Sequence, residues 1–196
     1  MFPFPNPSLK PGSSLADAFI TRGLGSFHDV VLWVWKLPYG RNSDRSDFSL
    51  VIKEGRGTCS TKHALLGQLA NDLGIDLQLM IGIFLMNEEN TREVAEILRR
   101  YTLREIPEAH CFLKCRESRF DFTMYKDGKP PLASHEFVYQ EAIQPPQIGE
   151  YKMRLHQEWI RRWMTTRVLA KPVAFEALWQ AREQCLQLFE QHTYGI

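Results

Sequence analysis

The chain has 196 residues, of which 44% are hydrophobic and 24% are charged, and this length and composition suit one globular domain with a buried core. Its formal net charge of +1 gives no electrostatic reason to expect nucleic acid or a membrane surface as a partner. The four cysteines form no disulfide framework, and neither a secretory signal nor a membrane-length apolar run is evident, so we expect a reduced, cytoplasmic protein.

Two short helices are expected after an N-terminal arm. The arm, residues 1–12, is rich in proline and is expected to be extended. Serines that can cap a helix follow it, and apolar residues recur at helical spacing behind the second capping position. The helices are expected over 15–22 and 26–37, and the polar stretch 39–49 is expected to form a surface loop.

The segment 55–59 leads into a clear helical pattern. Its two glycines permit a tight turn, Thr58 can cap a helix, and leucines recur at helical spacing behind it until Gly74. This pattern predicts a helix that begins within a residue or two of Cys59. A thiol in that first turn lies beside unpaired backbone N–H groups at the positive end of the helix dipole, which favours the nucleophilic thiolate.

Alternating patterns predict a sheet in the middle of the chain. Residues 75–86 are apolar on both faces, as in a central strand, and strands over 109–114 and 119–123 are expected to form a hairpin. The remaining expected elements are a helix over 91–101, a loop over 127–131, a strand over 136–142, a break over 144–146, and helices over 151–169 and 172–192.

A histidine and an aspartate are expected to face each other across this hairpin. If residues 114–117 form the connection, antiparallel pairing sets His110 directly opposite Asp121, where the carboxylate would hold the imidazole in one tautomer. A nucleophile, a base and an orienting acid in the order Cys59, His110, Asp121 indicate an activated cysteine. The opposite face is expected to be apolar and to carry Cys111, Leu113, Phe120 and Phe122.

Three segments of the chain resemble the motifs of a known superfamily. The segments GTCSTKHALL, IPEAHCFLK and RFDFT are similar to the cysteine, histidine and aspartate motifs of the transglutaminase-like superfamily, and the resemblance covers about residues 26–125. It implies a papain-like core, in which a helix bearing Cys59 packs on an antiparallel sheet bearing His110 and Asp121. It also implies that these three residues are catalytic.

The resemblance further implies an oxyanion hole. The backbone N–H of Cys59 would be one donor, and Trp33, Trp35 and Tyr39 are candidates for the second, upstream donor. The chain departs from the superfamily pattern at Phe112, where tryptophan is usual.

The expected activity is a thiol-dependent acyl-group reaction on an amide or ester bond, with a peptide, a protein or a small amide as substrate and with no cofactor and no metal. An acyl-enzyme can resolve to water or to an amine, so a hydrolase and an acyltransferase both stay open. The alternative is a non-catalytic binding or scaffolding module that retains the triad-like residues.

Other cysteines and histidines have simpler expected roles. Cys111 and Cys115 lack the second ligand pair of a zinc site. His63 lies one helical turn after the nucleophile, but no carboxylate is evident to orient it. His135 and His156 lie in polar stretches and are expected to be solvated.

We expect one α+β domain over residues 1–196. Its parts are an N-terminal arm over 1–25, a core over about 26–142 and a helical appendage over about 150–192. The two appended helices can pack on the catalytic core or pair with a second copy of the chain in a homodimer.

Overall fold

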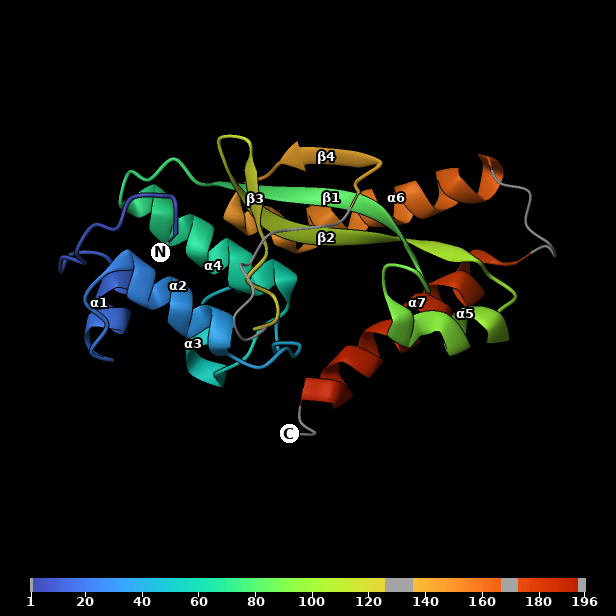
Figure 1. Cartoon of the computed structure of the whole chain (residues 1–196), viewed down its shortest axis with the longest axis horizontal. Helices are drawn as coiled ribbons and strands as arrows, with labels where there is room; N and C mark the ends of the chain where they lie inside the picture. The colour runs from blue at the N-terminus through green and yellow to red at the C-terminus, as the bar shows by residue number, and fades with distance from the viewer. Residues whose placement is uncertain (1, 126–135, 167–172, 194–196) are drawn as a thin grey trace.

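The computed structural model describes residues 2–125, 136–166 and 173–193, and within them the chain folds as an α+β protein (Figure 1). The expected α+β class is therefore confirmed, whereas the expected loop over 127–131 lies outside the described residues. The strands in these ranges form one antiparallel sheet in the order β3-β2-β1-β4. They are β1 (Gln78–Asn87), β2 (Glu105–Cys115), β3 (Ser118–Phe120) and β4 (Tyr139–Ala142).

Helices lie at both ends of this sheet. The described α-helices are α1 (Ser14–Ile20), α2 (Phe27–Lys36), α3 (Leu50–Glu54), α4 (Cys59–Asp72), α5 (Ala95–Arg100), α6 (Glu150–Thr166) and α7 (Phe175–Thr193), and short 3-10 turns are η1 (Arg92–Val94) and η2 (Pro145–Ile148). In Figure 1, α1 to α4 gather at one end of the sheet, α5 and α7 lie at the other, and α6 runs behind β1 and β2. Segments from both ends of the sequence therefore meet along the central strands.

The helix that carries Cys59 begins at that residue, as the sequence predicts. Thr58 has an extended backbone and forms a capping box with Thr61: the Thr61 N–H donates to Oγ1 of Thr58, and the Thr58 N–H donates to Oγ1 of Thr61 at 3.0 Å. The short helix α3 was not expected; it ends at Glu54 and is capped by Gly55, whose φ of 64° lies in the left-handed region that favours glycine.

Two groups of buried apolar side chains hold the helices on the sheet. The first joins α1, α2 and α4 to β1 and β2, and it includes Leu69 of α4 and Ile81 of β1. The second joins the far ends of β1 and β2 to α5, α6 and α7 through Met86 and Leu178. The C-terminal helices thus pack on the sheet of their own chain, which is one of the two expected arrangements; their pairing with a second copy stays a prediction.

The connection between β2 and β3 is shorter than expected. Cys115 pairs with Ser118, so the loop contains only Arg116 and Glu117 instead of four residues. Arg116 has a φ of 53°, and a two-residue loop with positive φ matches the twist of an antiparallel hairpin. The expected register is therefore wrong by two residues.

This shift changes how His110 and Asp121 are placed. Asp121 does not lie directly opposite His110, because the observed register would set Asp121 opposite Phe112, and β3 ends one residue before Asp121. A shift of two keeps every side chain on its expected face, since side chains alternate along a strand. The predicted apolar face is confirmed, because one buried core contains Cys111, Leu113, Phe120 and Phe122.

Within the described ranges, one edge of β2 carries no strand before Leu113. The carbonyls of Leu79 and Ile83 in β1 accept hydrogen bonds from Ile143 and from Val138, on the β4 side. Because backbone groups alternate sides along an antiparallel strand, the even-numbered residues of β1 bond β2, and the odd-numbered residues of β2 point to the opposite edge. Pro107 was expected to precede the strand, but it lies within β2 because its missing N–H falls at this uncovered edge.

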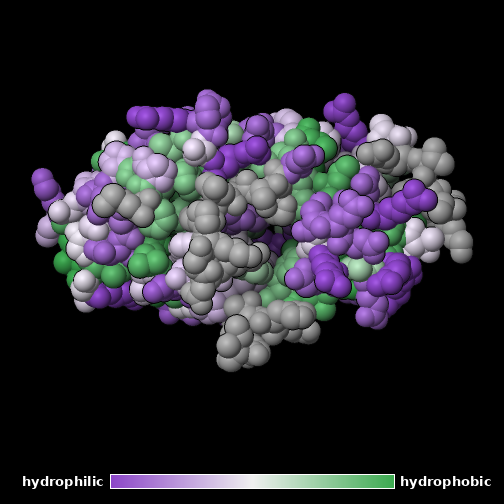
Figure 2. Space-filling model, viewed as in Figure 1, coloured by the Kyte–Doolittle hydropathy of each residue, from purple (hydrophilic) through white to green (hydrophobic). Residues whose placement is uncertain are grey.

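The face of the molecule in Figure 2 is largely hydrophilic, with hydrophobic side chains in separate groups between the polar ones. Among the described residues, the exposed large apolar side chains are those of Leu32, Met124, Tyr125 and Val138. None of the helices in the described ranges is long and apolar enough to cross a bilayer.

Replacement of Gly57 by alanine should destabilise the segment that precedes Cys59. A Cβ at Gly57 would lie 2.9 Å from Cγ of Lys62 and 2.9 Å from Cγ2 of Val51, and overpacking of this kind costs about 1–3 kcal/mol. Gly67→Ala is the control, because its nearest new contact is 3.4 Å and alanine favours a helix interior by up to about 1 kcal/mol. Denaturant unfolding measures both free energies, and equal stability of the two variants would contradict the packing at Gly57.

Candidate active site

Cys59 lines a pocket of about 500 Å³ at the N-terminus of α4. Its side chain is half-buried, and the first N–H groups of a helix have no acceptor within that helix. The pocket is also lined by His110 of β2, by Asp121, by Lys152 of α6 and by Arg182 of α7. Side chains from both ends of the sequence therefore surround one thiol.

The imidazole of His110 contacts both the thiol and Asp121. Its Nε2 lies 2.9 Å from Oδ2 of Asp121, which leaves Nδ1 for the hydrogen bond with Cys59. Burial lowers the pKa of His110, but the charges and hydrogen bonds of Asp121 and Cys59 raise it well above its ordinary value. Burial raises the pKa of Asp121, but the charge and hydrogen bond of His110 hold it far below its ordinary value. The structure thus brings the expected nucleophile, base and orienting acid into contact.

The thiol of Cys59 is more acidic than an ordinary cysteine. Burial raises its pKa, but the charges of Lys152 and His110, the hydrogen bond of His110 and the backbone N–H of Cys111 lower it to about 6. The Cys111 N–H can donate to Cys59 because it points to the edge of β2 that β3 does not cover. At neutral pH the cysteine and histidine therefore rest as a thiolate–imidazolium pair.

His63 of α4 ends the pairing between β2 and β3. A longer β3 would set Phe122 opposite Cys111, but the N–H of Phe122 donates to Nε2 of His63 at 2.7 Å instead. Nδ1 of His63 donates to the carbonyl of Cys59 at 2.6 Å, and burial lowers the pKa of His63 to about 4, so the ring is neutral. No carboxylate was expected beside His63, but Oδ1 of Asp121 lies 3.7 Å from its Nε2, and its hydrogen-bond partners are backbone groups on both sides of the site.

Lys62 holds the backbone at Thr123, the residue that follows Phe122. Its Nζ donates to the carbonyls of Thr123 at 2.8 Å and Leu37 at 2.6 Å, and burial lowers its pKa to about 7 against the opposing charge of Asp121. The N–H of Thr123 donates to Oδ1 of Asp121 at 2.9 Å and closes a local turn. Lys62 and His63 are thus positioning residues that direct Asp121 back toward His110.

Lys152 of α6 lies beside Cys59, and the sequence pattern did not predict it. Its Nζ donates to Oγ of Ser60 at 2.6 Å and lies 3.8 Å from Sγ of Cys59. Burial lowers the pKa of Lys152, but the charges of Cys111, Cys59 and Glu108 raise it above its ordinary value, so the side chain stays an ammonium. Lys152 is therefore a fixed positive charge beside the thiolate.

The buried face of α6 carries polar as well as apolar residues. The expectation that His156 is solvated is wrong: its side chain is 2% exposed, and its Nε2 donates to the carbonyl of Pro107 at the uncovered edge of β2, at 2.8 Å. Burial lowers the pKa of His156 to about 4. The sequence carried a signal for this face, because its buried residues recur about one helical turn apart. They are Lys152, His156, Ile160 and Trp163.

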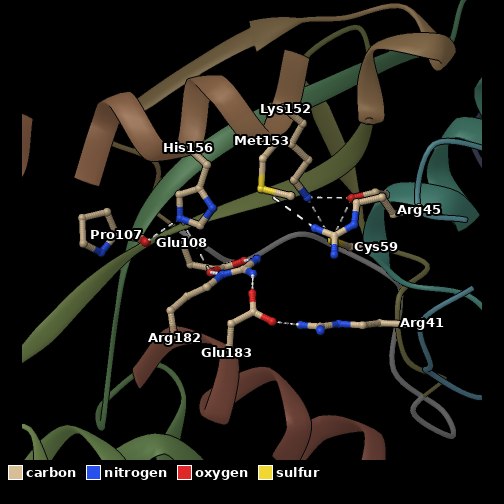
Figure 3. Close-up of polar contacts among 11 residues, drawn as sticks. Arg41, Arg45, Cys59, Pro107, Glu108, Lys152, Met153, His156, Arg182 and Glu183 are labelled. Carbon is tan, nitrogen blue, oxygen red and sulfur yellow. Dashed lines mark hydrogen bonds and ion pairs between the residues drawn. The ribbon is translucent and has the colours of Figure 1, made fainter. Parts of the chain in front are cut away.

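A buried ion pair ties α7 to the strand that carries His110. Nε and Nη2 of Arg182 donate to the two carboxylate oxygens of Glu108 at 2.8 and 2.9 Å. Burial raises the pKa of Glu108, but the charges of Arg182 and His156 lower it to about 2. Figure 3 shows this ion pair between α7 and β2 and its continuation from Arg182 through Glu183 to Arg41.

Three upstream side chains are candidates for the second oxyanion donor. Trp33 packs against the first core and does not line the pocket, whereas Trp35 and Tyr39 do. The indole N–H of Trp35 donates to the carbonyl of Met124 at 3.0 Å, and an indole has no second donor. Tyr39 is buried, lines the pocket and is held beside Gly57 by a parallel bridge. Burial, with the charges of Cys59 and Glu108, raises the pKa of Tyr39, so its hydroxyl keeps its proton.

In the part of the chain that the structure describes, no group of three or more His, Cys, Asp or Glu side chains is placed to hold a metal ion. Cys111 is buried in the first core, and burial raises the pKa of its thiol. Cys115 is a half-buried free thiol at the end of β2. His135 lies outside the described residues.

Comparisons with known proteins find nothing similar to this chain. No protein-family model matches it, and searches of the curated proteins and of the solved structures return no match. A functional proposal for this pocket therefore depends on its geometry and chemistry.

Alkylation of Cys59 by iodoacetamide should follow a titration with a midpoint near pH 6, because the thiolate is the reactive form and its pKa is about 6. Asp121→Asn removes the charge that keeps His110 protonated, so the pKa of His110 falls, the thiolate loses its cationic neighbour, and the midpoint rises. Site-resolved mass spectrometry over a pH series measures both midpoints. A wild-type midpoint near the ordinary value of 9.0 would contradict the electrostatics described here.

Proposed function

We propose that this protein is a thiol-dependent acyl-group enzyme in which Cys59 is the nucleophile, His110 the base and Asp121 the orienting acid. The observation that carries the proposal is the continuous contact from thiol to imidazole to carboxylate at the start of a helix that borders a pocket. A cysteine that only fills a core needs neither an oriented imidazole nor a lowered pKa.

The proposed reaction begins when the Cys59 thiolate attacks the carbonyl carbon of an amide or ester, and the C=O electron pair moves to oxygen. The backbone N–H of Cys59 and the hydroxyl of Tyr39 are candidate donors to that oxyanion. As the intermediate collapses, the imidazolium of His110 gives its Nδ1 proton to the leaving amine or alkoxide, and the acyl group stays on sulfur. Asp121 keeps Nε2 protonated, so proton exchange is confined to Nδ1.

The acyl-enzyme is then resolved by a second nucleophile. His110, now neutral, takes a proton from water or from an amine as it attacks the thioester carbonyl. Water gives a hydrolase and an amine gives an acyltransferase, and the same three residues serve both. We favour hydrolysis of a peptide, a protein or a small amide, by analogy with small enzymes that carry no accessory domain.

We also propose that the fold is the papain-like fold of the transglutaminase-like superfamily. Supporting features are the order of the elements, with a cysteine at the start of α4 followed by a histidine on β2 and an aspartate directly after β3. Because a thiolate nucleophile has to stay reduced, we expect the protein in a reducing compartment such as the cytoplasm.

The alternative proposal is a binding or scaffolding module that keeps these residues without turnover. Such a module has no use for an ionised thiol, and it predicts that an acyl donor leaves no adduct on Cys59. The two proposals therefore differ in a covalent product.

Wild-type protein mixed with p-nitrophenyl acetate should release a burst of p-nitrophenolate and gain one acetyl group on Cys59, seen by intact-mass and peptide mass spectrometry. Slow release after the burst measures hydrolysis, and its acceleration by an added primary amine would indicate acyl transfer. Cys59→Ser should abolish the burst, because a hydroxyl is a far weaker acid than a thiol.

The Cys59→Ser variant should keep its fold. The side chain is half-buried, so the free energy of unfolding should change by less than about 1 kcal/mol. A wild type that shows neither burst nor adduct would overturn the proposed activity. A serine variant that loses several times that free energy would indicate that Cys59 is a packing residue.

A further inference from the structure

Lys152 brings a buried ammonium group to the reacting sulfur from α6, a helix outside the motifs that resemble the superfamily. One N–H donates to Oγ of Ser60 at 2.6 Å and another is directed at Sγ of Cys59 at 3.8 Å. An ammonium group has three N–H donors, so a third is left over. Lys152 lines the same pocket as the nucleophile, which a substrate carbonyl has to enter.

The charges around Lys152 leave the thiolate as its closest anionic partner among the described residues. The charge of Glu108 raises the pKa of Lys152, but both oxygens of Glu108 accept hydrogen bonds from Arg182 at 2.8 and 2.9 Å. No carboxylate of the described ranges forms an ion pair with Lys152, and its side chain is 9% exposed. A buried charge of this kind is costly unless a counter-charge lies beside it.

We propose that Lys152 is a catalytic residue that donates a hydrogen bond from its ammonium to the oxyanion of the tetrahedral intermediate, together with the backbone N–H of Cys59. The inference rests on the proposed acyl chemistry of this site. As the S–C bond forms, the C=O electron pair moves to oxygen, so the negative charge passes from sulfur to an atom bonded to the attacked carbon. A donor fixed 3.8 Å from the sulfur can come within about 3 Å of that oxygen, the distance at which oxyanion donors act.

The contact with Ser60 gives Lys152 a fixed position, as oxyanion stabilisation requires. Ser60 is therefore a positioning residue for the ammonium. Protonation of Lys152 also protects the acyl-enzyme, because an ammonium has no lone pair with which to take the acyl group from sulfur.

The proposed role of Lys152 predicts different effects on two reactions of the same thiolate. Attack on p-nitrophenyl acetate forms an S–C bond, develops an oxyanion and then expels p-nitrophenolate. Attack on iodoacetamide forms an S–C bond at a saturated carbon and expels iodide, so no oxyanion develops. Both rates depend equally on the thiolate fraction, and the ratio of their high-pH plateau rate constants removes that shared dependence.

Lys152→Met should lower the plateau rate constant for acetylation about 100-fold or more, the loss typical of one oxyanion donor, while the plateau for alkylation stays close to wild type. Lys152→Arg keeps the charge and should retain part of the acetylation rate. Ser60→Ala should cause an intermediate loss, because it frees the ammonium to move. Arg154→Gln is the matched control: it removes an equal charge from an exposed position of α6 and should change neither plateau.

Each outcome supports or overturns the role of Lys152, the proposed function, or both. Equal ratios of acetylation to alkylation in wild type and Lys152→Met would overturn the role of Lys152 and leave the proposed function standing. A wild-type ratio no higher than that of a free thiol such as N-acetylcysteine would overturn the proposed function and this inference with it. If Lys152→Met does not fold, unchanged ratios in Lys152→Arg and Ser60→Ala would overturn the role of the fixed ammonium.

Discussion

The uncovered edge of β2 is the feature on which the rest of the site depends. Pairing with β3 stops because His63 takes the backbone N–H of Phe122 that a longer ladder would use. The edge that stays open presents the N–H of Cys111 to the thiol of Cys59, beside the imidazole of His110. A longer β3 would fill the space in which Cys59 and His110 meet, so the short strand is a condition for the proposed chemistry.

Charges of alternating sign run along this edge. Asp121 is followed by the His110 imidazolium, then by the Cys59 thiolate, and the Lys152 ammonium ends the series. Each buried charge lies beside one of opposite sign, which is the arrangement that makes burial tolerable. The first three come from the segments that resemble the superfamily and the last from α6, so the C-terminal helices are part of the site.

Local patterns in the sequence predicted most of the elements, α3 excepted, but not all of the partners. The helix start at Cys59 was predictable because capping and glycine signals are local, and the shared face of His110 and Asp121 followed from the alternation of side chains. The register of the hairpin was not predictable, because a two-residue loop and a four-residue loop both fit the alternation of side chains. Lys152 and His63 were missed because their partners lie far away in the sequence or are backbone groups, and no local pattern specifies such contacts.

The backbone amide of Cys111 offers the most direct test, because it should report the ionisation of Cys59 at the edge of β2. In ¹⁵N-labelled wild type, the Cys111 amide resonance should shift with a midpoint near pH 6, whereas that of Leu113, which lies opposite β3, should stay nearly constant. The shift should disappear in Cys59→Ser. A Cys111 amide that does not titrate, or that titrates equally in the serine variant, would contradict this account of the site.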